Sequence, residues 1–249
     1  MHDDPMQPAA SPVFCAVDTP SLDAARALAR RLAGIVGGLK LGMEFFYANG
    51  PDGFRSVAAH GLPIFLDLKL HDIPNTVAGA VRSLAPLAPA FLTIHTAGGS
   101  AMMMAAAEAA RDAAARAGVA RPQLLGVTVL TSLDADDLGA TGQDRDVAAQ
   151  TERLAALAQA SGLDGVVCSP KEIERLRRSC GPDFVLMVPG IRPAWAAAHD
   201  QKRVLTPAEA LALGADHLVI GRPITEANDP AEAARRVADE LPKDHSTSL

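Results

Sequence analysis

The sequence has no apolar stretch that approaches the roughly 18 residues needed to cross a bilayer. It also lacks an excess of basic residues, because 23 Lys and Arg stand against 29 Asp and Glu and give a formal net charge of −6. The first absence excludes a membrane-spanning protein. The second argues against a nucleic-acid partner, since binding to a polyanion depends on clustered positive charge.

Cysteine is scarce, with only three residues in 249. Cys15, Cys168 and Cys180 form neither a CxxC pair nor a metal-ligand spacing, and an odd number suits no disulfide framework. The first twelve residues lack the basic start and apolar stretch of a secretory signal. We therefore expect a soluble cytoplasmic protein with reduced thiols, in which Cys15 and Cys168 are buried as small hydrophobic residues.

The sequence does contain one pattern that repeats from end to end. A short apolar run rich in branched residues is followed by an alanine-rich amphipathic segment, which is typical of alternating strands and helices. Helices are expected, among others, at 21–33, 76–86, 100–117, 146–161 and 206–213. The eight expected strands are 13–18, 38–43, 63–69, 91–96, 123–130, 165–169, 184–190 and 217–221.

Eight such units without a long linker favour a closed barrel. The alternative is a doubly wound open sheet, but the turn after Asp18 has no GxGxxG fingerprint. We predict the α/β class, as a single-domain (β/α)8 TIM barrel over 12–241. An N-terminal tail at 1–11 and a C-terminal tail at 242–249 would flank it.

The densest group of charges lies where the third strand ends, and barrel active sites form at such ends. Asp67 and Lys69 stand two apart and share a face, Lys40 ends the second strand, and Asp72 follows in the loop. An ion-pair network that closes the barrel rim is the structural alternative, but it does not require the second carboxylate. A lysine between two carboxylates keeps its ammonium and so favours proton donation to a developing carbanion.

A metal site is a second reading of the same segment. Asp67, His71 and Asp72 carry suitable ligand atoms, but the ammonium of Lys69 would stand beside the cation and oppose it. We therefore expect no metal. His71 is expected to be a hydrogen-bonded structural histidine.

Two loops suggest a site for a phosphate. Arg192 closes a Pro-Gly-Ile-Arg sequence after the seventh strand, and Arg222 follows Gly221 after the eighth. Loops at these places often offer backbone N–H groups to a phosphate dianion, and arginine adds a charge-assisted fork. Solvated rim arginines are the alternative. The stretch 192–203 between the two strands is long enough for a lid, with Gln201 as a candidate contact or an ordinary surface residue.

These residues carry a resemblance to the orotidine 5'-monophosphate decarboxylase family over about 12–240. FLDLKLHDIPNTV at 65–77 resembles the family signature and is more specific than any single charged pair. Further matching motifs are the strand ending in Asp18, KLG at 40–42, LTS at 130–132, PGIR at 189–192, DQKR at 200–203 and IGRPIT at 220–225. The long alanine-rich fourth helix and the lid around Trp195 depart from the family without touching the chemistry.

The resemblance implies a role for each residue of the charged cluster. Lys69 would donate a proton to C6 of the pyrimidine as carbon dioxide leaves, and Asp67 would lie near the departing carboxylate. Lys40 would orient this pair and contact the ribose. Asp18 would hold the ribose hydroxyls.

The resemblance also implies a homodimer that needs neither metal nor organic cofactor. The family completes its active site across the interface, so Asp72 and Thr76 would serve the substrate of the other subunit. The other substrate contacts would be Thr131 and Ser132 at the ribose and pyrimidine, and Arg192, Gln201, Arg222 and the Gly221 backbone at the phosphate.

Two other functions stay open on the residues alone. A magnesium-dependent sugar-phosphate decarboxylase or aldolase of the same superfamily would share the DxKxxD strand, although the LTS motif and Gln201 argue against it. A catalytically inactive barrel that only binds nucleotides would share the phosphate loops.

Overall fold

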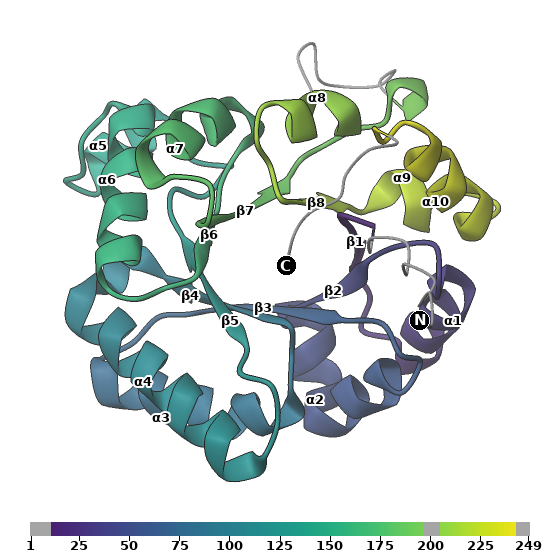
Figure 1. Cartoon of the computed structure of the whole chain (residues 1–249), viewed down its shortest axis with the longest axis horizontal. Coiled ribbons are helices and arrows are strands. Elements are labelled where there is room, and N and C mark those ends of the chain that lie inside the picture. Colours follow the sequence, from purple (N-terminus) through teal and green to yellow (C-terminus); the bar gives the residue numbers. More distant parts are fainter. Residues whose placement is uncertain (1–10, 197–204, 243–249) are drawn as a thin grey trace, which may run out of the picture.

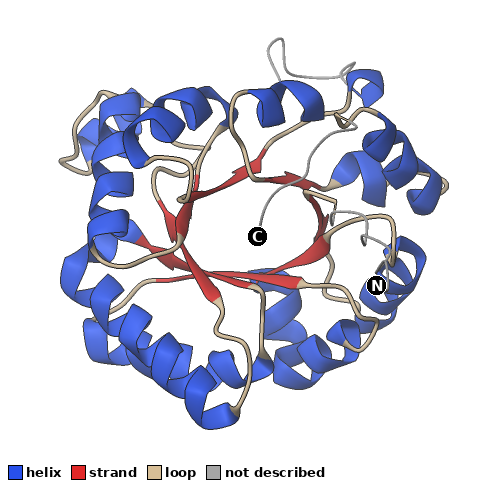
Figure 2. Cartoon of the chain, viewed as in Figure 1, coloured by secondary structure: helices blue, strands red, loops and turns tan. Residues whose placement is uncertain are grey.

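A computed structural model of the chain describes residues 11–196 and 205–242. Eight parallel strands follow one another in chain order around a closed barrel, and β1 pairs with β8 to complete it (Figure 1). Helices surround the ring of strands on the outside (Figure 2). The strands are β1 (Val13–Val17), β2 (Gly38–Gly42), β3 (Ile64–Leu70), β4 (Phe91–His95), β5 (Gln123–Val127), β6 (Gly165–Val167), β7 (Val185–Pro189) and β8 (His217–Ile220). The predicted TIM barrel and its eight strands are confirmed.

The five expected helices are also present, each within two residues of its predicted ends. Ser21, Asp146 and Thr206 cap three of them, because each side chain accepts a hydrogen bond from a first-turn backbone N–H. The helices are α1 (Leu22–Leu32), α2 (Met43–Ala58), α3 (Pro74–Leu84), α4 (Gly99–Ala117), α5 (Ala135–Ala140), α6 (Val147–Ala160), α7 (Ile173–Cys180), α8 (Pro207–Ala212), α9 (Arg222–Thr225) and α10 (Pro230–Asp239).

The barrel has two apolar layers because successive side chains of a strand point to opposite faces. Outward residues such as Leu39 and Leu66 pack with the buried faces of the helices. Inward residues include Phe14, Phe65 and Phe91, whose rings meet edge to face with centroids 5.5 to 6.4 Å apart. These rings form an aromatic floor across the barrel interior. The inward positions that follow Phe65 and Phe91 toward the strand ends carry the polar side chains of Asp67 and Thr93.

The cysteines of the barrel match the expectation from sequence. Cys15, Cys168 and Cys180 are buried and free. Burial raises the pKa of the Cys15 thiol to about 12, and burial also raises the pKa of Cys168. Both therefore stay protonated at neutral pH and contribute as small core residues.

Two further findings concern the chain as a whole. No helix within 11–196 or 205–242 is long and apolar enough to cross a membrane. The predicted tails at 1–11 and 242–249 lie outside the described residues except for Ser11 and Pro242, so these boundaries stay predictions.

Candidate active site

The charged cluster lies on the inner face of the barrel, directly above the aromatic floor. Asp67 follows Phe65 by two residues on β3 and is 9% exposed. The ammonium Nζ of Lys69 lies 2.7 Å from Asp67 Oδ2, and the Lys69 side chain is 28% exposed. The pair is thus reachable from the mouth yet partly shielded from water. The shielding strengthens its electrostatic interaction with any bound group.

The backbone of Lys69 is strained. Its φ is 50°, in the left-handed region that residues other than glycine rarely adopt. The cause is a bulge in β3: Leu66 pairs with Leu92 and Leu70 with Ile94, so β3 advances four residues where β4 advances two. Such a conformation costs about 1–3 kcal/mol and persists only where the surroundings hold it. From this conformation the lysine ammonium meets Asp67.

Thr93 on β4 is the residue that contacts both parts of this arrangement, and sequence reasoning missed it. Its hydroxyl accepts a hydrogen bond from the Lys69 backbone N–H at 2.8 Å and donates one to Asp67 Oδ1 at 2.9 Å. Thr93 is fully buried. A usable signal was present, because Thr93 is a polar residue at an inward position two after Phe91, between the apolar residues Leu92 and Ile94.

A second ion pair lies beside the first. Lys40 Nζ is 3.2 Å from Asp18 Oδ1, with the lysine side chain 15% exposed and the aspartate 65% exposed. The register places Lys40 beside Ala16 and Phe65 on the inner face. Within one chain the salt bridges of the described residues join Lys69 to Asp67 alone. A lysine held between the carboxylates at 67 and 72 therefore stays a prediction for the dimer.

Asp72 lies in the loop before α3 and Thr76 in the first turn of that helix, and both are exposed. The Asp72 carboxylate accepts a hydrogen bond from the backbone N–H of Ile73 at 2.6 Å. It makes no ion pair with any described residue. Among the described residues, neither side chain forms a hydrogen bond or ion pair with Lys69 or Asp67.

His71 does not take the hydrogen-bonded structural role that the sequence predicted. It is exposed, and no hydrogen bond joins its side chain to another described residue. Its ring stacks on His95, with centroids 5.3 Å apart and planes 28° apart. Burial, and secondarily the charges of His71 and Lys69, lower the pKa of His95. His95 is therefore a neutral ring beside the lysine at neutral pH.

One of the two predicted phosphate loops, the loop after β8, meets β1 at the barrel mouth. A Cβ added at Gly221 would lie 3.3 Å from Ala16 Cβ and 3.7 Å from Asp18 Oδ2, so the loop after β8 approaches the Asp18 carboxylate closely. Arg222 is exposed at the start of α9, and Arg192 is half-buried, with its N–H bonded to Leu205. Gln201 lies outside the described residues.

Thr131 and Ser132 occupy the centre of a turn after β5. The N–H of Leu133 closes this turn on the carbonyl of Leu130 at 2.9 Å, and both hydroxyl residues are exposed. No group of three or more His, Cys, Asp or Glu side chains within the described ranges is placed to hold a metal ion. The charged side chains at the mouth instead form two pairs of opposite charge, Lys69 with Asp67 and Lys40 with Asp18.

Comparison with known proteins decides the family. The model of the "Orotidine 5'-phosphate decarboxylase / HUMPS family" matches residues 11–237. The chain belongs to this family. The resemblance inferred from the signature at 65–77 is thereby confirmed.

Relatives of the orotidine 5'-phosphate decarboxylase family align over almost their whole length. The protein named orotidine 5'-phosphate decarboxylase from Paramagnetospirillum magneticum is 58% identical over 231 residues, covering 93% of this chain and 98% of that protein. Its counterpart of the same name in Rhodospirillum rubrum is 58% identical over 232 residues, covering 93% and 94%. The crystal structure of orotidine 5'-phosphate decarboxylase from Lactobacillus acidophilus superimposes with a TM-score of 0.82 at 39% identity, covering 93% and 99%.

Proposed function

We propose that the protein is a carboxy-lyase that converts orotidine 5'-monophosphate to uridine 5'-monophosphate and carbon dioxide, the last step of de novo pyrimidine biosynthesis. The observation that carries this proposal is the Lys69–Asp67 pair at 2.7 Å on the inner face of the barrel mouth. The names of the 58% identical relatives support orotidine 5'-monophosphate as the substrate, in preference to a sugar phosphate handled by the magnesium-dependent alternative.

The proposed reaction uses the pair in one sequence of steps. The bond between C6 and the carboxylate carbon breaks, carbon dioxide leaves, and the electron pair stays on C6. Lys69 Nζ donates a proton to C6, so the product carries a new C–H bond and the lysine regains a proton from solvent. Because the ring offers no obvious conjugated sink for the charge, a fixed ammonium near C6 is the stabilisation that the chemistry requires.

Asp67 acts on the other side of the same bond. Its carboxylate is fixed by hydrogen bonds from Lys69 Nζ and the Thr93 hydroxyl, and it cannot easily turn away from a substrate carboxylate placed beside it. Loss of carbon dioxide relieves this repulsion. Binding energy from the distant phosphate can offset the repulsion in the bound substrate.

The rest of the mouth supplies substrate contacts in this proposal. Lys40 and Asp18 hold the ribose hydroxyls, an assignment supported by their ion pair beside the Gly221 loop. Residues on the loops after β5, β7 and β8 contact the base, ribose and phosphate; these are Thr131, Ser132, Arg192, Gln201, Gly221 and Arg222. Neither metal nor organic cofactor takes part.

One assay tests the function. Purified protein is incubated with orotidine 5'-monophosphate, and uridine 5'-monophosphate and carbon dioxide are measured with and without EDTA. We expect turnover that the chelator leaves unchanged. Turnover that EDTA abolishes and magnesium restores would overturn the metal-free reaction. The absence of turnover by folded protein would leave the sugar-phosphate enzyme and the nucleotide-binding barrel as the remaining functions.

Replacing Arg222 with alanine should weaken substrate binding more than it slows the chemical step. A guanidinium that pairs with a phosphate contributes a charge-assisted hydrogen bond of about 1.5–3 kcal/mol, so kcat/KM should fall by about 10- to 100-fold. Steady-state kinetics measure this. Arg235→Ala on α10, whose exposed pair with Glu232 is a surface contact, is the control. A kcat/KM equal to that of the unaltered protein would remove Arg222 from the site.

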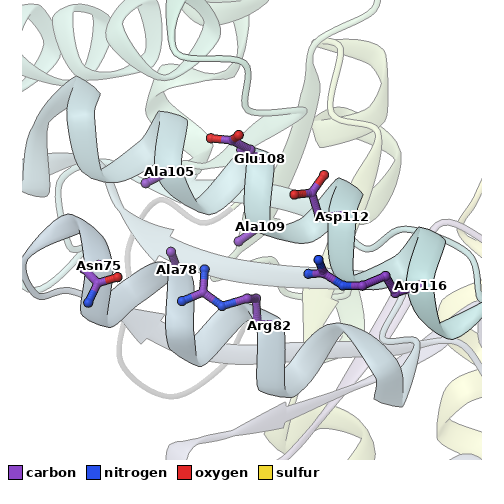
Figure 3. Close-up of a pocket in the computed structure, with 8 residues that line it drawn as sticks. All are labelled: Asn75, Ala78, Arg82, Ala105, Glu108, Ala109, Asp112 and Arg116. Atoms are coloured by element: carbon purple, nitrogen blue, oxygen red, sulfur yellow. The ribbon is translucent and has the colours of Figure 1, made fainter.

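The face formed by α3 and α4 supports a homodimer. Figure 3 shows the groove between these helices, lined by Asn75, Ala78, Arg82, Ala105, Glu108, Ala109, Asp112 and Arg116. Two arginines and two carboxylates share it, so the groove carries both of the charges that a two-fold interface would pair. The large apolar side chains of Ile73 and Met104, at the start of α3 and on α4, are 67% and 57% exposed. We propose that this face pairs with its copy.

This arrangement gives Asp72 and Thr76 a function that they lack in the single chain. Thr76 lies in the first turn of α3, next to the groove residue Asn75, and Asp72 lies in the loop just before the helix. In the proposed dimer they reach the active site of the other subunit and bring a second carboxylate to its Lys69. We also place the protein in the cytoplasm, a proposal supported by its three free thiols.

A further inference from the structure

We propose that Thr93 is a positioning residue for the decarboxylation, because its one hydroxyl holds both Asp67 and Lys69 in the geometry that reacts. This inference rests on the proposed function. It concerns a side chain that points into the barrel beneath the charged pair and that reaches Lys69 through the peptide backbone and Asp67 through the carboxylate.

The hydrogen-bond capacity of a hydroxyl makes the two contacts mutually dependent. Thr93 has one proton to donate, and the carboxylate Oδ1 of Asp67 takes it at 2.9 Å. A lone pair of the same oxygen then accepts the Lys69 N–H at 2.8 Å. Because Asp67 has no proton to give when ionised, the direction of both bonds is fixed. The hydroxyl therefore links the position of the carboxylate to that of the lysine backbone.

The bulge explains why Lys69 needs this partner. The regular ladder of backbone hydrogen bonds between β3 and β4 is interrupted between the pairs Leu66–Leu92 and Leu70–Ile94. The N–H of Lys69 is bonded to a side chain where a regular strand would offer a carbonyl. A buried N–H without a partner is unfavourable, so the hydroxyl supports the left-handed turn at φ 50°. The Lys69 ammonium meets Asp67 from this backbone conformation.

The threonine side chain is suited to this role beyond its hydroxyl. A β-branched residue is restricted at χ1, and Thr93 is enclosed completely, so its oxygen has little freedom to move. Asp67 is consequently held from two directions, by Thr93 at Oδ1 and by Lys69 at Oδ2. A preorganised carboxylate and ammonium need no rearrangement when the carbon–carbon bond breaks.

The test compares three variants in the full-length protein. Thr93→Val keeps the shape and removes the hydroxyl, and Thr93→Ser keeps the hydroxyl. Thr96→Val is the matched control, since Thr96 is an equally buried threonine whose hydroxyl donates to the Val127 carbonyl at 2.7 Å. We expect Thr93→Val to lower kcat by about 10- to 100-fold with little change in KM, Thr93→Ser to restore most of kcat, and Thr96→Val to affect thermal stability but not kcat.

Crystal structures of the variants separate this proposal from the proposed function. In Thr93→Val we expect Lys69 to leave its positive φ or Asp67 to rotate away from Lys69, and in Thr93→Ser we expect neither. An unchanged kcat, or an unchanged Lys69–Asp67 geometry in the valine variant, would overturn the role of Thr93. If the unaltered protein shows no turnover, the proposed function fails, and the crystal structures still decide whether Thr93 positions the pair.

Discussion

Lys69→Ala is expected to lower kcat on the order of 10⁴-fold while leaving the barrel folded. Within the part of the chain that the structure describes, Lys69 and the Thr93 hydroxyl are the proton donors bonded to Asp67. Without Lys69, the C6 carbanion would have to take its proton from water. The variant would also leave Asp67 without its cation, and bound substrate would then meet an uncompensated carboxylate. Uridine 5'-monophosphate formation under saturating substrate measures the effect.

Stability measurements make the loss interpretable. Lys69 is partly exposed and its pair with Asp67 is reachable by water, so thermal unfolding should show a folded, cooperative variant. Arg55→Ala is the control for loss of a positive charge, because its pair with Asp52 on α2 is exposed and remote from the mouth. Substantial turnover by folded Lys69→Ala protein would rule out the proposed proton donor.

Mixing Asp72→Ala protein with Lys69→Ala protein should restore activity that neither variant has alone. If Asp72 serves the other subunit, a hybrid dimer has one site that lacks both groups and one site that has both. Random exchange makes half of the dimers hybrid, so about a quarter of all sites should be intact. The recovered rate should approach that fraction of the unaltered rate.

The design of this experiment has two requirements. Each variant measured alone, at the same total concentration, gives the background rate. Subunit exchange is followed with a tag on one variant, so that hybrid dimers are counted directly. If hybrids form in the expected proportion and the rate stays at background, Asp72 acts within its own chain and the shared site is wrong.

The sequence predicted the positions of the charged residues well because the strand has a period of two. Once the strand at 63–69 is recognised, Asp67 must share the face of Phe65, and the barrel closure brings Lys40 and Asp18 to the same mouth. The residue types at the helix starts were also informative, because the Ser21 and Thr206 side chains cap the N-termini of α1 and α8. These inferences need only neighbours in sequence and the known direction of parallel strands.

Other features could not be predicted from local patterns. A regular strand would leave Lys69 in an extended conformation, and no glycine or turn sequence next to position 69 predicts its positive φ. The pairing of Lys40 with Asp18 instead of the 67–72 segment depends on how far each side chain reaches across the mouth. The stacking of His71 on His95 depends on the loop after β3 meeting the end of β4.

The sequence by itself determined the barrel, its eight strands, the family and the list of charged residues at the mouth, because these follow from periodicity, strand direction and the signature at 65–77. Only the tertiary structure decided how the central lysine is held. Thr93 is 24 residues from Lys69 and 26 from Asp67 along the chain, and its two hydrogen bonds exist only because β3 bulges against β4 at this level. Hydrogen bonds are short and directional, so a contact between distant segments depends on register to within one residue.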